Sequence, residues 1–513
     1  MSDNMRGVYT NLTQIRRSVF REVAKVAYLG EEVPGRIDDL PYEIIPGEIA
    51  TYRESVFLER AIVGERIRLT MGLPLQSVDR PSRISEGVKH AAKSEAYYQP
   101  PLINIIKFAC NACEDNTYEV SNGCQGCLAH PCREICPKQA ISFVNKKAYI
   151  DKEKCISCGQ CQKVCPYGAI LKKERPCAKA CGMDAIRSDE HGRADIDYDK
   201  CVSCGQCLVN CPFGAIADKS QIVQVINSIQ QGNEVIAVIA PAFVGQFGVK
   251  VDVGVLKAAM KELGFASLEE VAVGADLCTI QEADDFLNEV PEKLPFMGTS
   301  CCPAWSVMAK KEFPDYANCI SMALTPMVLT ARLVRRKHPN SKIVFIGPCA
   351  AKKLEAMRKS VRSEVDFVLT FEEVAAMFEA KGIIMDEIDA GEEIDFNEAS
   401  RDGRGFAVSG GVANAVVNVI KEKYPDREVK VQAAEGLNNC RKMMQQAVNG
   451  KYPGYLLEGM ACPGGCIAGA GTIQPLRKSA ALVNNYKAKA NKDKASESKY
   501  KRSLNKLVKG DLK

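Results

Sequence analysis

The sequence predicts an α/β domain of two lobes, preceded by a cysteine-rich α+β domain and a helical N-terminal segment. Three observations lead to this division of the 513 residues. Residues 1–100 contain no cysteine and carry apolar residues at helical spacing, whereas sixteen of the 24 cysteines lie within 101–220. Residues 221–480 alternate between apolar, β-branched runs and helical stretches. Residues 481–513 are a basic tail, which we expect to be solvated and frayed.

The composition indicates a packed, metal-binding protein. Hydrophobic residues make up 46% of the chain, and the net charge of +5 is too small for a typical nucleic-acid binder. The cysteine content is far above ordinary usage, but a secreted disulfide scaffold would be a much shorter chain. We therefore expect the cysteines to bind metal, and we expect no nucleic-acid partner.

The sequence carries no clear export or membrane signal. Arg16-Arg17 resembles a twin-arginine export signal, but Arg21 and Glu22 interrupt the apolar run that should follow it. The longest apolar stretch, 235–244, contains a proline and is too short to span a bilayer. We expect a soluble, cytoplasmic protein that does not contact a membrane.

Apolar residues at helical spacing predict two helices in the first hundred residues, over 12–24 and 58–69. A loop punctuated by proline and glycine separates them. We expect a helical layer that packs against the metal-binding domains and has no activity of its own. The role of this segment is not legible from its residues.

Two copies of one cysteine motif lie in the second domain. Each has the spacing Cys-x2-Cys-x2-Cys-x3-Cys-Pro followed by Gly-Ala-Ile, which indicates an internal duplication. This is the spacing of bacterial two-cluster ferredoxins, in which the fourth cysteine of each copy ligates the other cluster. Structural zinc is the alternative, but zinc sites usually take two separated pairs of ligands. The crossing rule predicts two 4Fe–4S clusters, held by Cys155, Cys158, Cys161 with Cys211, and by Cys201, Cys204, Cys207 with Cys165.

Eight further cysteines of this domain form looser copies of the motif. Cys124 to Cys136 repeats it with one longer gap, a Cys-x2-Cys pair precedes that copy, and Cys177 with Cys181 resembles its second half. Eight thiolates satisfy two more 4Fe–4S clusters, and four clusters in one segment indicate an electron path. The exact pairing is left open. The crossing rule suggests Cys124, Cys127, Cys132 with Cys181, and Cys110, Cys113, Cys177 with Cys136.

Short apolar runs followed by loops predict the strands of the α/β domain. We expect a buried strand within 234–241 and a continued α/β alternation over 251–263 and 268–273. Loops at the carboxyl ends of parallel strands are where α/β folds gather a site. Further strands are expected at Lys342–Ile346, Phe406–Val408, Val429–Val431 and Tyr455–Leu457.

Five cysteines in three short stretches mark that site. They lie in Thr-Ser-Cys-Cys-Pro-Ala-Trp at 299–305, in Gly-Pro-Cys-Ala-Ala-Lys-Lys-Leu-Glu at 347–355 and in Glu-Gly-Met-Ala-Cys-Pro-Gly-Gly-Cys at 458–466. Four thiolates from distant stretches suit one metal cluster, because iron–sulfur centres take soft sulfur donors. A fifth thiol is then left over for chemistry.

The three stretches together resemble the active-site signatures of iron-only (FeFe) hydrogenases, and the likeness extends over about 150–475. It is strongest to the branch with Thr-Ser-Cys-Cys-Pro-Ala-Trp and additional N-terminal cluster motifs. The resemblance implies a 4Fe–4S cubane joined through one cysteine to a diiron unit with carbon monoxide, cyanide and azadithiolate ligands. Cys466 would bridge to the diiron unit. The implied cubane ligands are Cys302, Cys349, Cys462 and Cys466.

The resemblance also assigns roles to residues around the cluster. Cys301 fits the thiol that exchanges protons with the azadithiolate amine. Lys352 would donate a charge-assisted hydrogen bond to a cyanide, with Glu355 positioning it. A simple surface salt bridge between Lys352 and Glu355 is the alternative. Three residues match those that line the diiron pocket and exclude water: Met460, Ala240 and Pro241.

One departure from the family pattern concerns the proton path. Many members carry an acid pair after Thr-Ile-Met, whereas this chain has Thr-Ile-Gln-Glu-Ala-Asp-Asp at 279–285. Ala283 stands where a relay glutamate is usual. Either protons leave by another route, or the relay is supplied by one of three neighbours: Glu282, Asp284 and Asp285.

The reaction that the resemblance implies is the reversible interconversion of H2 with two protons and two electrons. Electrons would pass through the 4Fe–4S clusters to a ferredoxin or similar small carrier, and diiron maturation proteins would supply the diiron unit. The alternative is a hydrogenase-like iron–sulfur scaffold, or a redox or H2 sensor, with little turnover. A pure polyferredoxin would leave 299–475 without a role. Direction, potentials and oligomeric state are not legible from the sequence.

Overall fold

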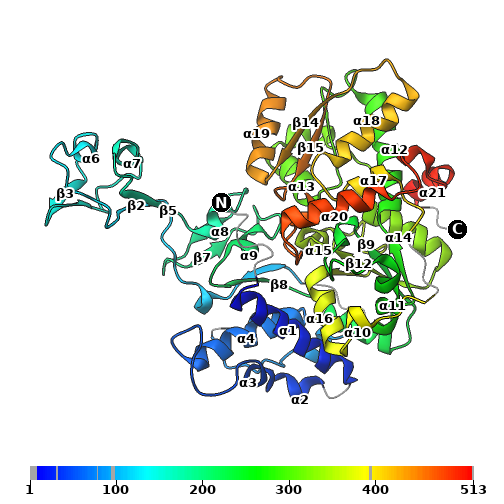
Figure 1. The fold of residues 1–513 in the computed structure, drawn as a ribbon, viewed down its shortest axis with the longest axis horizontal. Helices are drawn as coiled ribbons and strands as arrows, with labels where there is room; N and C mark the ends of the chain where they lie inside the picture. The colour runs from blue at the N-terminus through cyan, green and yellow to red at the C-terminus, as the bar shows by residue number, and fades with distance from the viewer. Residues whose placement is uncertain (1–8, 31–32, 78, 94–98, 392–395, 511–513) are drawn as a thin grey trace.

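The computed structural model describes residues 9–30, 33–77, 79–93, 99–391 and 396–510. Four parts are visible in Figure 1: an N-terminal helical layer, an outer cysteine-rich unit that stands apart, an inner cysteine-rich unit and a large α/β domain. Within the described ranges, no helix is long and apolar enough to cross a membrane.

The N-terminal layer is helical, and the two helices expected from its periodicity are present. The Thr10 side chain accepts a hydrogen bond from the backbone N–H of Thr13, and Ser55 caps the second long helix in the same way. The first helix packs against α10 (Ile222–Gln230) and α16 (Phe371–Lys381) of the following domain. The layer contains α1 (Asn11–Tyr28), α2 (Val33–Ile37), α3 (Leu40–Ile44), α4 (Val56–Thr70) and α5 (Val88–Ala91).

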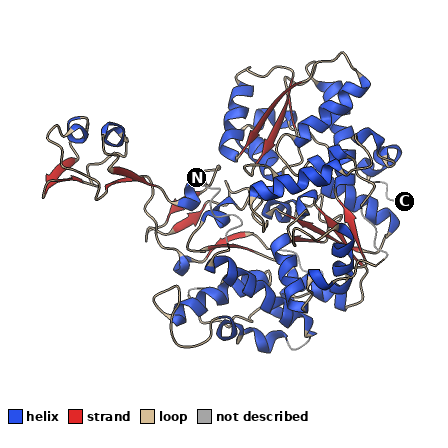
Figure 2. Ribbon diagram, viewed as in Figure 1, coloured by secondary structure: helices blue, strands red, loops and turns tan. Residues whose placement is uncertain are grey.

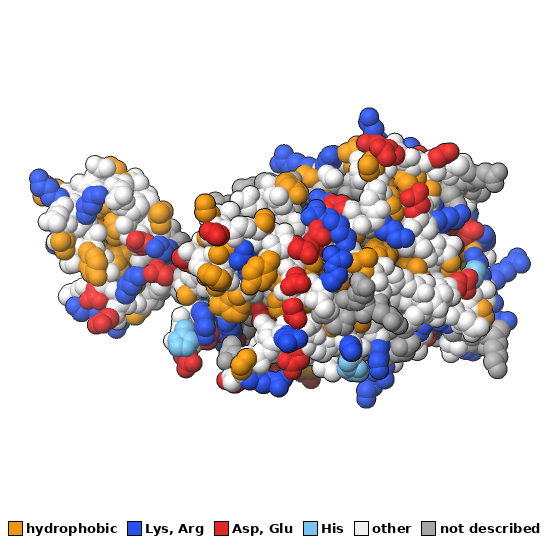
Figure 3. All heavy atoms as spheres, turned by 90° about the horizontal axis from the view of Figure 1, so that it is seen from below, with side chains coloured by type: hydrophobic (Ala, Val, Ile, Leu, Met, Phe, Trp, Pro, Cys, Tyr) orange, Lys and Arg blue, Asp and Glu red, His pale blue; other side chains and the backbone are white. Residues whose placement is uncertain are grey.

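The cysteine-rich segment forms two units, which corrects the expectation of one domain over 101–220. The outer unit (residues 117–173) consists of two antiparallel strand pairs and two short helices, and a narrow connection joins it to the rest (Figure 3). The outer unit contains the cysteine motifs at 124–136 and 155–165, which are consecutive in the chain, so the two most similar motifs, 155–165 and 201–211, lie in different units. The outer unit contains β2 (Thr117–Val120), α6 (Pro131–Glu134), β3 (Ile141–Val144), β4 (Lys147–Ile150), α7 (Gln160–Val164) and β5 (Ile170–Lys173).

The inner unit (residues 103–113 and 176–218) lies between the N-terminal layer and the α/β domain (Figure 1). Its first and last strands, β1 and β8, pair antiparallel, so the chain enters and leaves the unit at one place. A second pair, β6 with β7, completes it. The inner unit contains β1 (Ile103–Ile105), α8 (Pro176–Lys179), β6 (Ile186–Ser188), β7 (Ala194–Ile196), α9 (Gln206–Asn210) and β8 (Ile216–Asp218).

The α/β domain is built on two fully parallel sheets, which Figure 2 shows with helices packed around them. The four-stranded sheet has the order β10-β9-β12-β13, and the three-stranded sheet has the order β11-β15-β14. All five residues of β9 are buried, as the near-continuous apolar run of a covered parallel strand requires. The strands are β9 (Val235–Ile239), β10 (Ser267–Glu270), β11 (Met297–Gly298), β12 (Lys342–Gly347), β13 (Phe367–Thr370), β14 (Lys430–Glu435) and β15 (Tyr455–Met460).

Helices connect these strands and cover the sheets, so the alternation expected over 221–480 is present. The remaining helices of the domain are α11 (Val253–Leu263), α12 (Ala272–Glu289), α13 (Pro303–Glu312), α14 (Pro326–Lys337), α15 (Ala350–Ala356), α17 (Arg401–Gly405), α18 (Gly411–Lys423), α19 (Leu437–Val448) and α20 (Leu476–Ala488).

The strand expected at Phe406–Val408 does not form. These residues make the turn between α17 and α18. The two helices approach each other closely at this turn, because a Cβ at Gly411 would lie 2.0 Å from the carbonyl oxygen of Gly405. Phe406 and Ala407 are buried and line the central cavity described below. Their apolar side chains serve that cavity, and in the sequence they resemble a short buried strand.

The basic tail expected at 481–513 is packed through residue 510. Helix α20 crosses the expected boundary, and α21 (Leu504–Lys509) buries Leu504 and Leu507 against the α/β domain. The Tyr500 hydroxyl donates to Glu398 at 2.6 Å, and Lys499 pairs with the same carboxylate. The charge count concealed two apolar residues that share one face of a helix.

We predict that Lys353→Met lowers the free energy of unfolding by about 3–5 kcal/mol. The Lys353 side chain is fully buried, and its Nζ lies 2.7 Å from Asp218 and 2.8 Å from Glu373. Removing the ammonium leaves two carboxylates without their cation. Urea denaturation measures the change. The matched control is Lys423→Met, which breaks an exposed pair with Asp284 and should cost at most about 1 kcal/mol. Equal effects of both variants would contradict the prediction.

Candidate metal centre

The three cysteine stretches of the α/β domain all follow parallel strands. Cys349 follows β12, and Cys462 and Cys466 follow β15, as the sequence predicts. Cys301 and Cys302 follow β11, a two-residue strand that sequence reasoning missed. β11 pairs with β15 while β12 belongs to the other sheet, so the carboxyl edges of both sheets face the same place.

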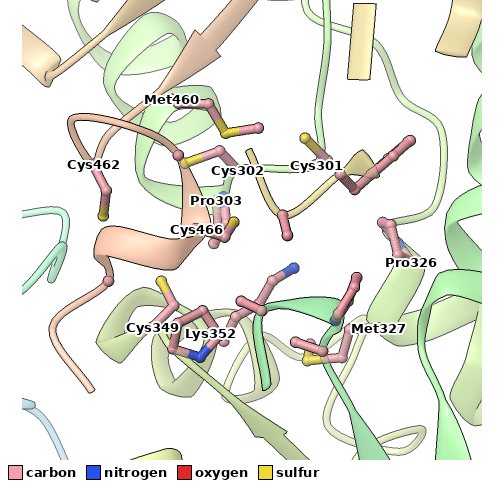
Figure 4. Close-up of a pocket in the computed structure, with 18 of the residues that line it drawn as sticks. Cys301, Cys302, Pro303, Pro326, Met327, Cys349, Lys352, Met460, Cys462 and Cys466 are labelled. Carbon is pink, nitrogen blue, oxygen red and sulfur yellow. The ribbon is translucent and has the colours of Figure 1, made fainter. Parts of the chain in front are cut away.

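The five cysteines line one largely apolar cavity. Figure 4 shows Cys349 and Cys462 at one end of it, Cys302 and Cys466 in the middle, and Cys301 with Pro326 and Met327 at the other end. Lys352 is the only charged side chain among the described lining residues. The other predicted pocket residues, Ala240, Pro241 and Met460, also line the cavity.

The donor set fits an iron–sulfur cluster. Burial raises the pKa of the Cys349 thiol well above its usual range and that of Cys466 to about 12, and the other cysteine thiols add to both shifts. Such thiols become thiolates when a metal replaces their protons. Among the residues that the structure describes, no three Cys, His, Asp or Glu side chains are grouped to hold a single ion. The spread of these thiols therefore suits a multi-iron cluster better than zinc.

Glu282 stands behind Cys301. Its Oε1 accepts from the backbone N–H of Ser300 at 2.9 Å, and the Glu282 side chain is fully buried. Burial raises the pKa of Glu282 to about 7, although hydrogen bonds from Ser300 oppose the shift. The pKa of the Cys301 thiol is raised well above its usual range by burial and then by Glu282. A carboxyl group with a pKa near neutrality thus lies beside the surplus thiol.

The other candidates for the proton path lie farther out on α12. Ala283 is buried and has no titratable group. Asp284 pairs with Lys423 at the surface. Asp285 is partly exposed, and burial together with Glu289 raises its pKa to about 6. Of the three alternatives, Glu282 is the one that the fold places next to Cys301.

Lys352 and Glu355 form a largely buried pair, which corrects the interpretation as a surface salt bridge. Their Nζ and Oε2 atoms are 2.6 Å apart, and Glu355 also accepts from the Thr325 hydroxyl at 2.6 Å. Burial opposes the charge of Lys352, but Glu355 raises its pKa, so the ammonium stays charged. Figure 4 shows the Lys352 side chain directed into the cavity.

Sequence reasoning missed Glu458, the first residue of the third cysteine stretch. It is buried, and its two oxygens accept from the backbone N–H groups of Gly410 and Ala413, each at 2.7 Å. Burial raises the pKa of Glu458. The carboxyl group joins the start of α18 to β15. An acidic residue inside an otherwise apolar strand was the sequence feature that could have indicated this role.

The cysteine-rich units group their thiols differently from the pairing expected from sequence. In the outer unit one small cavity is lined by Cys124, Cys127, Cys132 and Cys165. In the inner unit another is lined by Cys110, Cys113, Cys177 and Cys211. Fourth cysteines do cross between motifs, but they cross within a unit, because the copies that pair are neighbours in the fold rather than the two most similar in sequence.

The remaining upstream cysteines are also grouped within one unit rather than across the two units. Cys204 and Cys207 lie close to Cys201 and Cys181 in the inner unit. In the outer unit Cys161 lies close to Cys155 and Cys158, and Cys136 packs in the same cluster of side chains. The groups are therefore Cys201, Cys204, Cys207 with Cys181, and Cys155, Cys158, Cys161 with Cys136.

The inner unit reaches the central cavity. Cys204 is one of the lining residues, and Gln206 Nε2 lies 3.3 Å from the Sγ of Cys462. Gly205 has a φ of +79°, and a Cβ there would lie 2.6 Å from the Cβ of Ala470, so only glycine allows this approach. The inner unit thus places one of its thiols, that of Cys204, at the same cavity as the central thiols.

Comparisons with known proteins agree with this site. Residues 233–470 match the family model described as the iron only hydrogenase large subunit, C-terminal domain. Residues 148–171 match a 4Fe-4S binding domain, and residues 172–222 match the LdpA Fe-S cluster-binding domain.

Three of the similar proteins illustrate the likeness. The chain is 31% identical over 373 residues to the periplasmic [Fe] hydrogenase large subunit of Nitratidesulfovibrio vulgaris, covering 63% of this chain and 85% of that one. It is 28% identical over 444 residues to iron hydrogenase 1 of Clostridium pasteurianum, covering 76% of each. It is 25% identical over 266 residues to the cytosolic Fe-S cluster assembly factor narfl of Danio rerio, covering 42% of this chain and 65% of that one.

The fold and the site define an iron–sulfur protein with an α/β domain and ferredoxin-like units. The chain belongs to the iron-only hydrogenase family. It is accordingly a metal-binding protein of an oxidoreductase family, as the sequence motifs indicate.

Proposed function

We propose that the protein is a hydrogenase that interconverts H2 with two protons and two electrons. The observation that carries this proposal is the set of residues around one largely apolar cavity: four thiols, a charged Lys352 and the surplus thiol Cys301 backed by Glu282. A scaffold that only holds a cluster needs the four thiols but has no use for a buried thiol beside a buried acid.

Four thiols of the cavity would hold a 4Fe–4S cubane, with Cys466 also joining the diiron unit. The ligands would be Cys302, Cys349, Cys462 and Cys466. Bound there, the diiron unit with its carbon monoxide, cyanide and azadithiolate ligands would supply the chemistry of H2. Lys352 would donate to a cyanide, and the apolar wall, including Met460, would exclude water. The sixteen upstream cysteines would hold four further 4Fe–4S clusters in the groups described above.

Protons would leave through Cys301 and then Glu282. The pKa of Glu282 is about 7, so its carboxyl group can both accept and give a proton near neutral pH. Asp285, one turn along α12 and partly exposed, would pass the proton to water. The relay acid that Ala283 lacks would thus be supplied by the residue before it.

We predict that Glu282→Gln lowers H2 oxidation about 100-fold. Oxidation needs the carboxylate form of Glu282 as proton acceptor, so the wild-type rate should rise as pH increases through about 7. Glutamine cannot accept the proton, and this pH dependence should disappear. Dye-linked assays across pH 5–9 measure both effects. Asp284→Asn, on the exposed side of the same helix, should leave rate and pH profile unchanged.

Infrared spectroscopy and an activity assay together test the proposed function. Protein produced with diiron maturation proteins should show bands of iron-bound carbon monoxide and cyanide, and it should reduce an artificial dye with H2. Absence of these bands, or bands without turnover at any potential, would overturn the proposal.

A second candidate is an iron–sulfur scaffold or sensor with little turnover. The similarity to a cytosolic Fe-S cluster assembly factor favours it. In that case the cubane and the upstream clusters would form, but Cys301 and Glu282 would be dispensable for any measurable property. The same assay separates the candidates, because only a hydrogenase turns over.

The ferredoxin-like units suggest that electrons are exchanged with a ferredoxin or similar small carrier. The outer unit, which stands apart from the rest, is the natural place for that exchange (Figure 1). We further propose that the protein works in the cytoplasm without a membrane or nucleic-acid partner.

A further inference from the structure

Two arginines of the N-terminal layer contact one cysteine-bearing turn of the inner unit. Arg66, on α4, donates to the carbonyl oxygen of Gly214. Arg53, just before α4, donates to the carbonyl oxygen of Phe213 at 2.7 Å. Both carbonyls lie in the turn after Cys211, and the backbone N–H of Ala215 in the same turn lies 3.4 Å from the Cys211 Sγ. The N-terminal layer therefore covers this thiol from outside.

Arg53 also joins this turn to a second cysteine loop. The same Nη2 atom donates to the carbonyl oxygen of Ala109 at 3.1 Å, and Ala109 precedes Cys110. Cys110 and Cys211 line one small cavity together with Cys113 and Cys177. A single guanidinium group thus holds two of the loops that would ligate one cluster.

The charge of Arg66 is buried without an acidic partner of its own. Its side chain is 4% exposed, and among the described residues it forms no ion pair with a carboxylate. Glu372 pairs with Arg16 instead. Burial lowers the pKa of Arg66 to about 10, while Cys211 is one of the groups that support its charge. The guanidinium group remains positive at neutral pH and lies within electrostatic reach of Cys211.

A third arginine borders the same cavity. Arg175 is 3% exposed and donates to the carbonyl oxygen of Cys113 at 2.8 Å. The outer unit offers a contrast, because the cavity of Cys124, Cys127, Cys132 and Cys165 has no charged residue among its described lining residues. Of these two cavities, only the inner one has a buried arginine among the described residues that line it.

We propose that the N-terminal layer is an electrostatic tuning element, in which Arg66 and Arg53 raise the reduction potential of the cluster held by Cys110, Cys113, Cys177 and Cys211. Reduction adds one electron to a 4Fe–4S cluster and makes its charge, with four thiolates, one unit more negative. A buried cation stabilises the more negative state, and low polarity strengthens the effect. An electron then resides on this cluster in preference to the clusters of the outer unit. The inference rests on the proposed upstream clusters but not on H2 turnover.

The test is a redox titration of the full-length, cluster-loaded protein, reduced stepwise with dithionite and followed by electron paramagnetic resonance. The signal of this cluster is assigned as the one that Cys113→Ser alters. In Arg66→Gln, the ratio of reduced to oxidised cluster at a fixed potential should fall about tenfold, a shift of about 59 mV for one electron. The other signals should not move. Arg66→Lys keeps the charge and should retain most of the wild-type potential.

The matched control is Arg68→Gln. Arg68 lies on the same helix and is 5% exposed, but among the described residues its guanidinium group donates only to carbonyls of the N-terminal layer, such as Pro74 and Ile84. An equal shift in Arg68→Gln would overturn the inference, as would an unshifted signal in Arg66→Gln. The Arg66→Gln variant could lose the cluster, which iron analysis would show as about four fewer irons. In that case Arg53→Gln must lower the reduction potential of the cluster. An unchanged potential in Arg53→Gln would then overturn the inference. Shifted potentials without H2 turnover would support this inference and remove the proposed function instead.

Discussion

Cys301→Ala should lower H2 turnover by about two to four orders of magnitude while leaving the clusters in place. Cys301 lines the cavity, but in the proposed arrangement four other thiols there would supply the donors for one cubane. Its loss should therefore break proton transfer between the cavity and Glu282 without releasing iron. The measurements are dye-linked activity, iron content and the infrared bands of carbon monoxide and cyanide, of which only the first should change strongly.

A second buried thiol supplies the control for this variant. Cys278, on α12, is fully buried and close to Glu282, but it does not line the cavity. Cys278→Ala should keep activity within a few-fold of wild type. If Cys301→Ala retains full activity, or if Cys278→Ala loses as much, then Cys301 is not the proton-exchanging thiol.

Cys466→Ala should abolish turnover and remove the carbon monoxide and cyanide bands. Cys466 lies in the middle of the cavity, between the end with Cys349 and Cys462 and the end with Cys301 (Figure 4). In the proposed arrangement it is the thiol that would join the cubane to the diiron unit, so both cofactor parts depend on it. Iron analysis should show loss of the central cluster while the upstream clusters remain visible by electron paramagnetic resonance.

Cys440→Ala is the matched control for Cys466→Ala. The Cys440 thiol is buried in the neighbouring core, and its hydrogen bonds go to the carbonyl oxygens of Ala434 and Met460. This variant should keep the infrared bands and most of the activity. A protein with Cys466→Ala that still carried the diiron bands would remove Cys466 from the ligand set.

The sequence was most informative where chemistry demands particular residues at particular spacings. The sequence could indicate that the three central cysteine stretches share one site, because ligands of one cluster have few alternatives, and the structure brings their thiols to one cavity. The strands before Cys349 and Cys462 could be predicted because covered parallel strands carry near-continuous apolar runs. Short β11 escaped prediction because two residues carry no period.

Other errors came from contacts that link distant parts of the chain. Copies 155–165 and 201–211 are the most alike, yet each pairs with a less regular copy, because pairing depends on which loops share a folded unit. Sequence alone could not choose Glu282 from its acidic neighbours, because its position beside Ser300 and Cys301 depends on packing between distant parts of the chain. The buried position of Leu507 could not be read from a tail dominated by lysine.

The central cavity takes its thiols from loops that follow two different sheets, one behind β12 and the other behind β11 and β15. A cluster bound there would cross-link the two halves of the domain, each built on one of these sheets, at the point where their strands end. Chelating the iron should then first weaken the contact between the two halves. In the metal-free protein, a protease should cleave the loops that carry these cysteines faster than it cleaves the helices on the surface.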